Sequence, residues 1–175
     1  AFGSLLHWIV SLYLTLQILS HYLRAVLTSP GSPASADLPA EEIEDLKTTP
    51  RSAVTRASWC RRCNNLKPPR THHCSYCQRC VLCFDHHCPW IANCVGFHNY
   101  RSFVLFLAFL WVGCVYIVWL SGDVLFSSDS SKSWGSSERT GFIFAFVITL
   151  AMVVSVGALL GWHIYLCLTA QTTVE

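Results

Sequence analysis

Three long apolar segments without charged side chains dominate the chain. Asp, Glu, Lys and Arg are absent from residues 1–23, 102–122 and 140–174. A helix needs about 20 predominantly apolar residues to cross the hydrocarbon core of a bilayer. The pattern therefore predicts membrane-spanning helices rather than buried core helices, at residues 1–28, 101–122 and 140–168.

Polar segments separate these helices. A Pro- and Gly-containing stretch begins a linker at 29–58, and the acidic patch Glu41–Asp45 within it indicates a short solvated helix. A Ser-rich loop is predicted at 123–139, and a short polar segment at 169–175. Ten Lys and Arg residues lie between Arg24 and Arg101, against two in 123–139. Basic residues favour the cytosolic side, so residues 59–100 are expected to face the cytosol and 123–139 the lumen.

The composition agrees with a membrane protein. Hydrophobic residues make up 53% of the chain and charged residues 13%, whereas soluble domains have about 25% charged residues. This balance excludes intrinsic disorder, which requires low hydrophobicity and high charge. The net charge of +2 does not favour a nucleic-acid partner, and none is expected.

Eight of the ten cysteines lie between Cys60 and Cys94. On the cytosolic side, metal binding is favoured over disulfides. Two interleaved sets have the same spacing of 0, 3, 13 and 20 residues. Each has three thiols and one imidazole, which is typical of a closed structural zinc site and unlike an iron–sulfur cluster. Spacing alone leaves a different sharing of ligands open. The sets are Cys60, Cys63, His73 and Cys80, and Cys74, Cys77, His87 and Cys94.

The 14-residue repeat leaves three reactive side chains without a metal set. Cys88 would begin a third set, but Ile91 stands where its partner cysteine would be. Asp85 and His86 precede it, so an acid, a base and a thiol occur within four residues. An imidazole can activate a thiol and a carboxylate can orient the imidazole. The alternative is that Asp85 and His86 support the zinc ligands and that Cys88 is a structural thiol.

The remaining cysteines receive simpler interpretations. Cys83 lies outside the repeat and is either a spare thiol or a lipidation site. Cys114 and Cys167 lie within predicted helices and are expected to be packing residues.

Residues Cys60 to Tyr100 closely resemble the DHHC family of protein S-acyltransferases. The resemblance extends to the Pro30-Gly31 pair and to Thr172-Thr173-Val174-Glu175, which match short motifs of the family. The matching positions are Cys60-x2-Cys63, Lys67-Pro68-Pro69-Arg70, His72-His73-Cys74, Cys77, Cys80, Asp85-His86-His87-Cys88-Pro89-Trp90, Asn93-Cys94-Val95-Gly96 and Asn99-Tyr100.

The resemblance implies an architecture and a reaction. The fold would be an all-α membrane protein with a small cytosolic two-zinc domain, of whose four helices this chain holds the second to fourth. The family's first helix and C-terminal tail are expected to lie outside this chain. Palmitoyl-CoA would donate its acyl group to Cys88 and then to cysteines of membrane-associated substrate proteins. The enzyme is expected in the Golgi, the endoplasmic reticulum or the plasma membrane.

The resemblance also implies roles for single residues. Cys88 would be the nucleophile, His86 its base and Asp85 the orienting acid, while Trp90 would help to roof the lipid cavity. Thr173, or as a second choice Thr172, would bond to Asp85, and Asn99 would brace the tail.

Two further interpretations concern the binding of the acyl donor. Gly113 would leave room for the acyl chain if it faces the cavity. Basic residues would bind either the phosphates of CoA or anionic lipid headgroups. They are Arg61, Arg62, Lys67, Arg70 and Arg101.

Two rival functions remain open at this stage. A membrane-anchored zinc module without catalysis would tolerate Cys88→Ser. A RING-like ubiquitin ligase also interleaves two zinc sets, but it leaves Asp85, His86 and Cys88 unexplained, and its usual ligand spacing differs.

Overall fold

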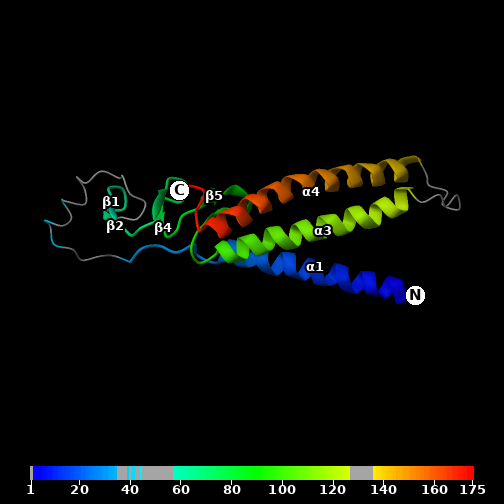
Figure 1. The fold of residues 1–175 in the computed structure, drawn as a ribbon, viewed down its shortest axis with the longest axis horizontal. Coiled ribbons are helices and arrows are strands. Elements are labelled where there is room, and N and C mark those ends of the chain that lie inside the picture. The colour runs from blue at the N-terminus through cyan, green and yellow to red at the C-terminus, as the bar shows by residue number, and fades with distance from the viewer. Residues whose placement is uncertain (1, 35–38, 40, 42–43, 45–56, 127–135) are drawn as a thin grey trace. The chain divides into compact units, whose positions relative to one another are not determined.

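Apolar sequence accounts for three long helices, whose backbone polar groups are satisfied within each helix. The computed structural model describes residues 2–34, 39, 41, 44, 57–126 and 136–175 (Figure 1). Contacts divide the chain into a unit of residues 1–20 with 104–165 and a unit of residues 21–103 with 166–175. The long helices in the described residues are α1 (Phe2–Leu27), α3 (Tyr100–Phe126) and α4 (Ser136–Thr169).

All three helices are long and apolar enough to span a membrane, as predicted. The candidate spans are Ser4–Leu27, Tyr100–Phe126 and Ser137–Thr169. The predicted loop at 123–139 is too long, because the apolar residues Val124 to Phe126 continue α3 and α4 already begins at Ser136. The remainder of that loop and most of the acidic patch Glu41–Asp45 lie outside the described residues.

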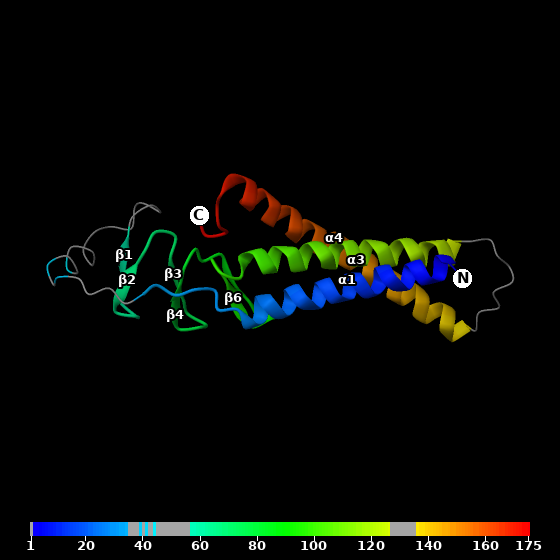
Figure 2. The ribbon, with the colours of Figure 1, turned by 90° about the horizontal axis from the view of Figure 1, so that it is seen from below.

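Within the first unit, α3 contacts both other helices, and α4 crosses the α1–α3 pair (Figure 2). His7 Nδ1 and Tyr116 OH lie 2.6 Å apart between α1 and α3. Trp111 of α3 donates its indole N–H to the carbonyl of Val153 in α4 at 3.1 Å. Close packing by small residues and polar contacts of this kind are typical of helices associating in membranes.

Gly113 contributes to this packing rather than to an open space. A Cβ atom at Gly113 would lie 3.3 Å from Ile18 Cδ1 of α1. A place for Gly113 beside an acyl chain stays a prediction. The missing side chain lets α1 and α3 approach each other.

The described part of the second unit contains three β-hairpins that repeat every 14 residues. They are β1 (Ser58–Cys60) with β2 (Asn65–Lys67), β3 (His72–Cys74) with β4 (Arg79–Val81), and β5 (His86–Cys88) with β6 (Asn93–Val95). Their registers are equivalent: Ser58 pairs with Lys67, His72 with Val81, and His86 with Val95. The third turn contains the short helix η1 (Pro89–Ile91).

Backbone conformation repeats together with the register. Asn64, Gln78 and Ala92, each four residues after the last residue of the first strand, have left-handed φ angles of 47°, 53° and 47°. Such angles are uncommon for residues other than glycine. The hairpin that carries Cys88 is therefore a third copy of the two hairpins that precede it.

Two asparagine side chains join the end of α1 to the third hairpin. Asn93 Nδ2 lies 3.2 Å from the carbonyl of Val26 and 3.1 Å from that of Thr28. Asn99 Nδ2 donates to the carbonyl of Ala25 at 3.1 Å. The last carbonyls of a helix have no partner within it, so these amides cap α1. We call Asn93 and Asn99 the asparagine clasp.

The segment after α1 adds backbone pairing to the clasp. Leu82 N–H donates to the Gly31 carbonyl at 3.1 Å, and His98 N–H donates to the Pro30 carbonyl at 3.2 Å. Gly31 has φ +97°, and a Cβ atom there would lie 2.7 Å from the His98 ring. The glycine is needed both for this conformation and for the close approach.

Candidate active site and metal sites

Cysteine and histidine side chains gather in two clusters that could hold metal ions. They are Cys60, Cys63, His73 and Cys80, and Cys74, Cys77, His87 and Cys94, with the ligand atoms of each within 4.8 Å of one another. These are the two sets predicted from the spacing, and the described residues do not form the alternative pairing.

The geometry of both clusters fits a tetrahedral ion bound through Nδ1 of the histidine. Bond lengths of about 2.3 Å to sulfur and 2.1 Å to nitrogen give tetrahedron edges of about 3.6–3.8 Å. His73 Nδ1 lies 3.7 and 3.2 Å from the Sγ atoms of Cys60 and Cys63. His87 Nδ1 lies 3.8, 3.4 and 3.6 Å from those of Cys74, Cys77 and Cys94.

The donor chemistry also favours a cation. Burial and the neighbouring thiols raise the pKa of Cys80 and of Cys94, because a thiolate there would lie close to other sulfur atoms. A divalent cation would offset this penalty and bind the thiolates directly.

The two clusters connect the three hairpins in series. The first joins the β1–β2 turn to the cross-strand pair His73–Cys80, and the second joins the β3–β4 turn to the pair His87–Cys94. The third turn has no following hairpin to join. Cys88 therefore occupies the position of Cys60 and Cys74 without belonging to either cluster.

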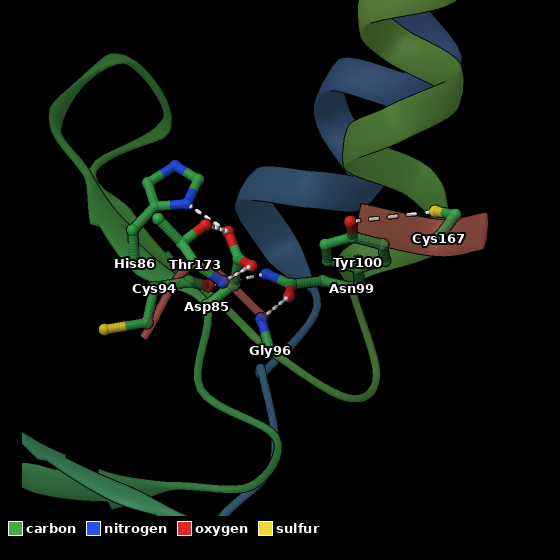
Figure 3. Close-up of polar contacts among 8 residues, drawn as sticks. All are labelled: Asp85, His86, Cys94, Gly96, Asn99, Tyr100, Cys167 and Thr173. Atoms are coloured by element: carbon green, nitrogen blue, oxygen red, sulfur yellow. Dashed lines mark hydrogen bonds and ion pairs between the residues drawn. The ribbon is translucent and has the colours of Figure 1, made fainter. Parts of the chain in front are cut away.

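Asp85 lies at the centre of a hydrogen-bond network with His86 and Thr173 (Figure 3). Its side chain is fully buried, and its Oδ2 accepts a hydrogen bond from His86 Nδ1 at 2.7 Å. Thr173 donates to the same carboxylate twice, from its backbone N–H to Oδ1 at 2.9 Å and from its hydroxyl to Oδ2 at 2.8 Å. Although burial raises the pKa of Asp85, the hydrogen bonds from His86 and Thr173 lower it overall.

The environment favours a charged imidazole next to a thiolate. Burial lowers the pKa of His86, but hydrogen bonds with Asp85 and Cys88 outweigh it and raise that pKa to about 9. Burial raises the pKa of Cys88, while hydrogen bonds from His86 and from the backbone N–H groups of Ile91 and Trp90 lower it overall. The ring of Phe103 contacts His86 edge-on, with ring centroids 5.4 Å apart. Such a pair has the properties of an activated nucleophile.

Arg70 holds the C-terminal segment that carries Thr173. Its Nε and Nη2 donate to Glu175 Oε1 and Oε2 at 2.6 and 3.0 Å. Nη2 also donates to the carbonyl of Ala170 at 2.9 Å. Burial raises the pKa of Glu175, but the hydrogen bond from Arg70 lowers it overall. Because its pKa is lowered, the Glu175 carboxylate stays charged to a lower pH than an ordinary glutamate. It therefore holds the segment 169–175 until the pH falls to that lowered pKa.

Several expected site residues have other surroundings. Lys67 is 2% exposed, so it is not available for CoA phosphates, and Arg70 binds Glu175 with a side chain that is 36% exposed. Arg61 and Arg62 are exposed in the β1–β2 turn, and Arg101 is exposed on α3. Trp90 is 87% exposed, and its carbonyl accepts a hydrogen bond from Tyr22 OH at 3.4 Å.

One expected bracing residue, Asn99, differs from the prediction, whereas Thr173 is the threonine that bonds to Asp85. Asn99 belongs to the asparagine clasp and also donates to the Cys94 carbonyl at 2.9 Å. Among the described residues it does not bond to the segment 169–175, because its amide faces the unpaired carbonyls of α1. Thr172 does not reach Asp85; its backbone N–H donates to Glu175 at 2.9 Å.

The three cysteines that belong neither to the metal clusters nor to the Cys88 site differ in their burial. Cys114 is buried in α3, as expected for a packing residue. Cys167 is exposed at the end of α4, so the expectation that it is a packing residue is wrong. Cys83 is partly buried between β4 and β5, in a left-handed conformation with φ 43°.

The asparagine clasp and the Arg70–Glu175 pair were not identified from the sequence. Asn93 could have been found from the repeat, because it stands directly opposite Cys88 in the hairpin register. Arg70 and Glu175 both lie within matched motifs, but nothing in the spacing indicates that they meet.

Comparison with known proteins agrees with this geometry. The model of the DHHC palmitoyltransferase family matches residues 53–175. "Probable protein S-acyltransferase 16" from Arabidopsis thaliana is 37% identical over 167 residues, which cover 93% of this chain and 58% of that protein. "Palmitoyltransferase pfa3" from Emericella nidulans is 35% identical over 180 residues, which cover 95% of this chain and 34% of that protein. This chain thus spans 58% or less of the length of these two relatives. With the family model matching most of its length, the chain belongs to the DHHC palmitoyltransferase family.

Proposed function

We propose that this chain forms the catalytic core of a protein S-acyltransferase. It would move a fatty acyl group, palmitoyl in the first instance, from acyl-CoA to cysteine thiols of membrane-associated proteins. The observation that carries the proposal is the network at the third hairpin, in which buried Asp85 holds His86 next to Cys88. The relatives named as acyltransferases support the same chemistry.

The reaction has two thioester exchanges. In the first, the Cys88 thiolate attacks the acyl-CoA carbonyl, a new sulfur–carbon bond forms at Cys88, and the CoA thiolate leaves and is protonated. In the second, the thiolate of a substrate protein attacks the acyl-Cys88 carbonyl and releases Cys88. His86 would accept the thiol proton in one step and return it in the other, while Asp85 would hold the imidazole in place.

Two structural zinc ions are part of the proposal. The two clusters would each hold one ion, whose contribution is to fix the hairpins and not to react. His87 would bind through Nδ1, so the adjacent His86 stays available to Cys88. The membrane helices would hold the acyl chain, since burying it in hydrocarbon stabilises it by about 0.8 kcal/mol per CH₂ group.

The positions of the remaining parts follow from this arrangement. The hairpin unit would face the cytosol, where acyl-CoA is found. The exposed Trp90 would cover the acyl chain where it leaves the bilayer. Exposed Arg61, Arg62 and Arg101 would attract either CoA phosphates or anionic lipid headgroups.

The proposal is tested by incubating the full-length protein with radiolabelled palmitoyl-CoA. We expect a hydroxylamine-sensitive label that Cys88→Ser abolishes. Cys114→Ser, which removes a buried thiol on α3, is the matched control and should retain the label. A hydroxylamine-sensitive label of unchanged intensity in Cys88→Ser would reject the assignment and favour a non-catalytic zinc module.

Arg70→Gln is expected to slow Cys88 acylation about five- to tenfold, because a lost hydrogen bond is typically worth about 1 kcal/mol. The variant loses the paired hydrogen bonds from the Arg70 guanidinium to Glu175. The C-terminal segment is then held less firmly, and the hydrogen bonds from Thr173 to Asp85 weaken. The measurement is the single-turnover rate of acyl loading. Arg139→Gln, an exposed arginine in the first turns of α4, is the control. Equal rates for the two variants would contradict the positioning role of Arg70.

A further inference from the structure

Two arginines from different helices flank the place where α1 ends and α3 begins. Asn99 of the asparagine clasp donates from Nδ2 to the carbonyl of Ala25 at 3.1 Å, which holds the start of α3 against the last turn of α1 (Figure 1). Arg24 directly precedes Ala25, and Arg101 follows Asn99 by two residues. Both arginine side chains are exposed, so the clasp brings two positive charges to one part of the surface.

His21 shows that the two charges act on a common point. It lies three residues before Arg24 on α1, and residues three apart on a helix are neighbours on its surface. The positive charges of both Arg24 and Arg101 act electrostatically on the His21 ring. Arg101 is therefore the contribution of α3 to a group that is otherwise formed by α1. We call His21, Arg24 and Arg101 the juxtamembrane basic cluster.

The two positive charges are not balanced by a carboxylate. Within the described part of the chain, neither Arg24 nor Arg101 forms an ion pair, and the carboxylates of Asp85 and Glu175 are engaged elsewhere in this unit. Arg101 also lies in the first turn of α3, which contains no acidic residue. A positive charge there opposes the helix dipole. Helix stability therefore does not explain Arg101, whereas a bound anion would.

The cluster lies at the ends of two candidate spans, where lipid phosphates are found. Arg24 is three residues before the end of the span Ser4–Leu27, and Arg101 is the second residue of the span Tyr100–Phe126. Arginine side chains at the ends of membrane helices extend towards the headgroups. A guanidinium group binds phosphate through paired hydrogen bonds, so two of them from two helices can bind one phosphate from two sides.

We propose that the juxtamembrane basic cluster binds the phosphate of an anionic glycerophospholipid, with Arg24 and Arg101 as its two charged ligands. The bound lipid would offset the repulsion between the two guanidinium groups and hold the end of α1 against the start of α3, next to the asparagine clasp. This assigns Arg101 to a lipid phosphate rather than to a phosphate of CoA. The inference requires helices in a membrane but no acyl transfer, so it can fail while the proposed function stands.

The test uses the full-length protein in nanodiscs that hold equal amounts of phosphatidylcholine and phosphatidylserine. Native mass spectrometry after mild detergent extraction measures how much phosphatidylserine stays bound relative to phosphatidylcholine. We expect Arg24→Gln and Arg101→Gln each to lower this preference about fivefold, the contribution of one arginine near an anionic lipid surface. Arg139→Gln, an exposed arginine near the start of the candidate span Ser137–Thr169, is the matched control and should keep the preference. Circular dichroism checks that every variant retains its helices.

A variant with both substitutions distinguishes one shared site from two separate surface charges. If Arg24 and Arg101 hold the same phosphate, the effects of the two substitutions do not multiply, because residues that share a partner are energetically coupled. Effects that multiply to about 25-fold would show two independent charges and overturn the shared site.

Excess free CoA distinguishes the two sources of phosphate. We expect it to leave the bound phosphatidylserine in place. Displacement of the lipid by CoA would assign the cluster to the acyl donor and overturn the inference, as would an unchanged lipid preference in both single variants. Neither outcome bears on the acyl label at Cys88, which tests the proposed function separately.

Discussion

Cys94→Ser is expected to abolish acyl loading of Cys88, with a loss of about 100-fold or more. Cys94 is fully buried and forms a cross-strand pair with His87 in the hairpin that carries Cys88. Loss of this ligand would remove the metal ion proposed to hold the third hairpin to the second. Since metal binding supplies much of the folding free energy of such small domains, β5 and β6 should lose their register.

A matched variant in the other cluster makes this prediction specific. Cys63→Ser also removes one thiol from one cluster, but that cluster joins the first hairpin to the second. We expect both variants to lose one zinc ion by elemental analysis, while Cys63→Ser keeps a measurable rate of loading. Equal loss of loading in the two variants would show that the hairpins fold as one unit and contradict the serial arrangement.

Asp85→Asn is expected to reduce Cys88 acylation by roughly 10⁴-fold, the scale seen when the carboxylate partner of a catalytic histidine becomes an amide. The side chain keeps its shape but loses the charge that favours the imidazolium form of His86. The pKa of His86 should fall from about 9 and that of Cys88 should rise. Less thiolate then exists at neutral pH, so the pH profile of Cys88 alkylation should move to higher pH.

Thr173 provides a graded control for this effect. Thr173→Val removes the 2.8 Å hydroxyl hydrogen bond to Asp85 but retains the backbone one. A hydrogen bond to a charged group is worth about 1.5–3 kcal/mol, so a loss of about 10- to 150-fold is expected. Thr173→Ser should restore the rate. An unshifted alkylation profile in Asp85→Asn would show that the carboxylate does not set the charge of this site.

Much of the architecture could be predicted because it depends on local patterns. Uncharged segments determine the candidate spans, and a strict 14-residue period places the metal ligands and isolates Cys88. The period is visible because every copy uses the same register and the same left-handed turn residue. The sequence also predicts that the third hairpin forms no metal site, because Ile91 stands where the first two hairpins have a cysteine.

Contacts between distant segments could not be predicted in this way. Asn93 meets α1 across 65 to 68 residues, and Arg70 meets Glu175 across 105. Neither pair has a periodic signal. Packing with distant residues also decides the surroundings of single residues. Lys67 was expected to bind a ligand but is buried, and the missing side chain of Gly113 lies against Ile18 of α1.

The asparagine clasp has a consequence for how this molecule can be divided. The third hairpin lacks a metal set of its own, and it is supported by the second cluster, by the end of α1 through Asn93, and by the C-terminal segment through Thr173. These supports come from sequence before, within and after the cysteine-rich region. That region is therefore not a transferable module: grafted alone onto another anchor, it would carry its metals but not a working nucleophile.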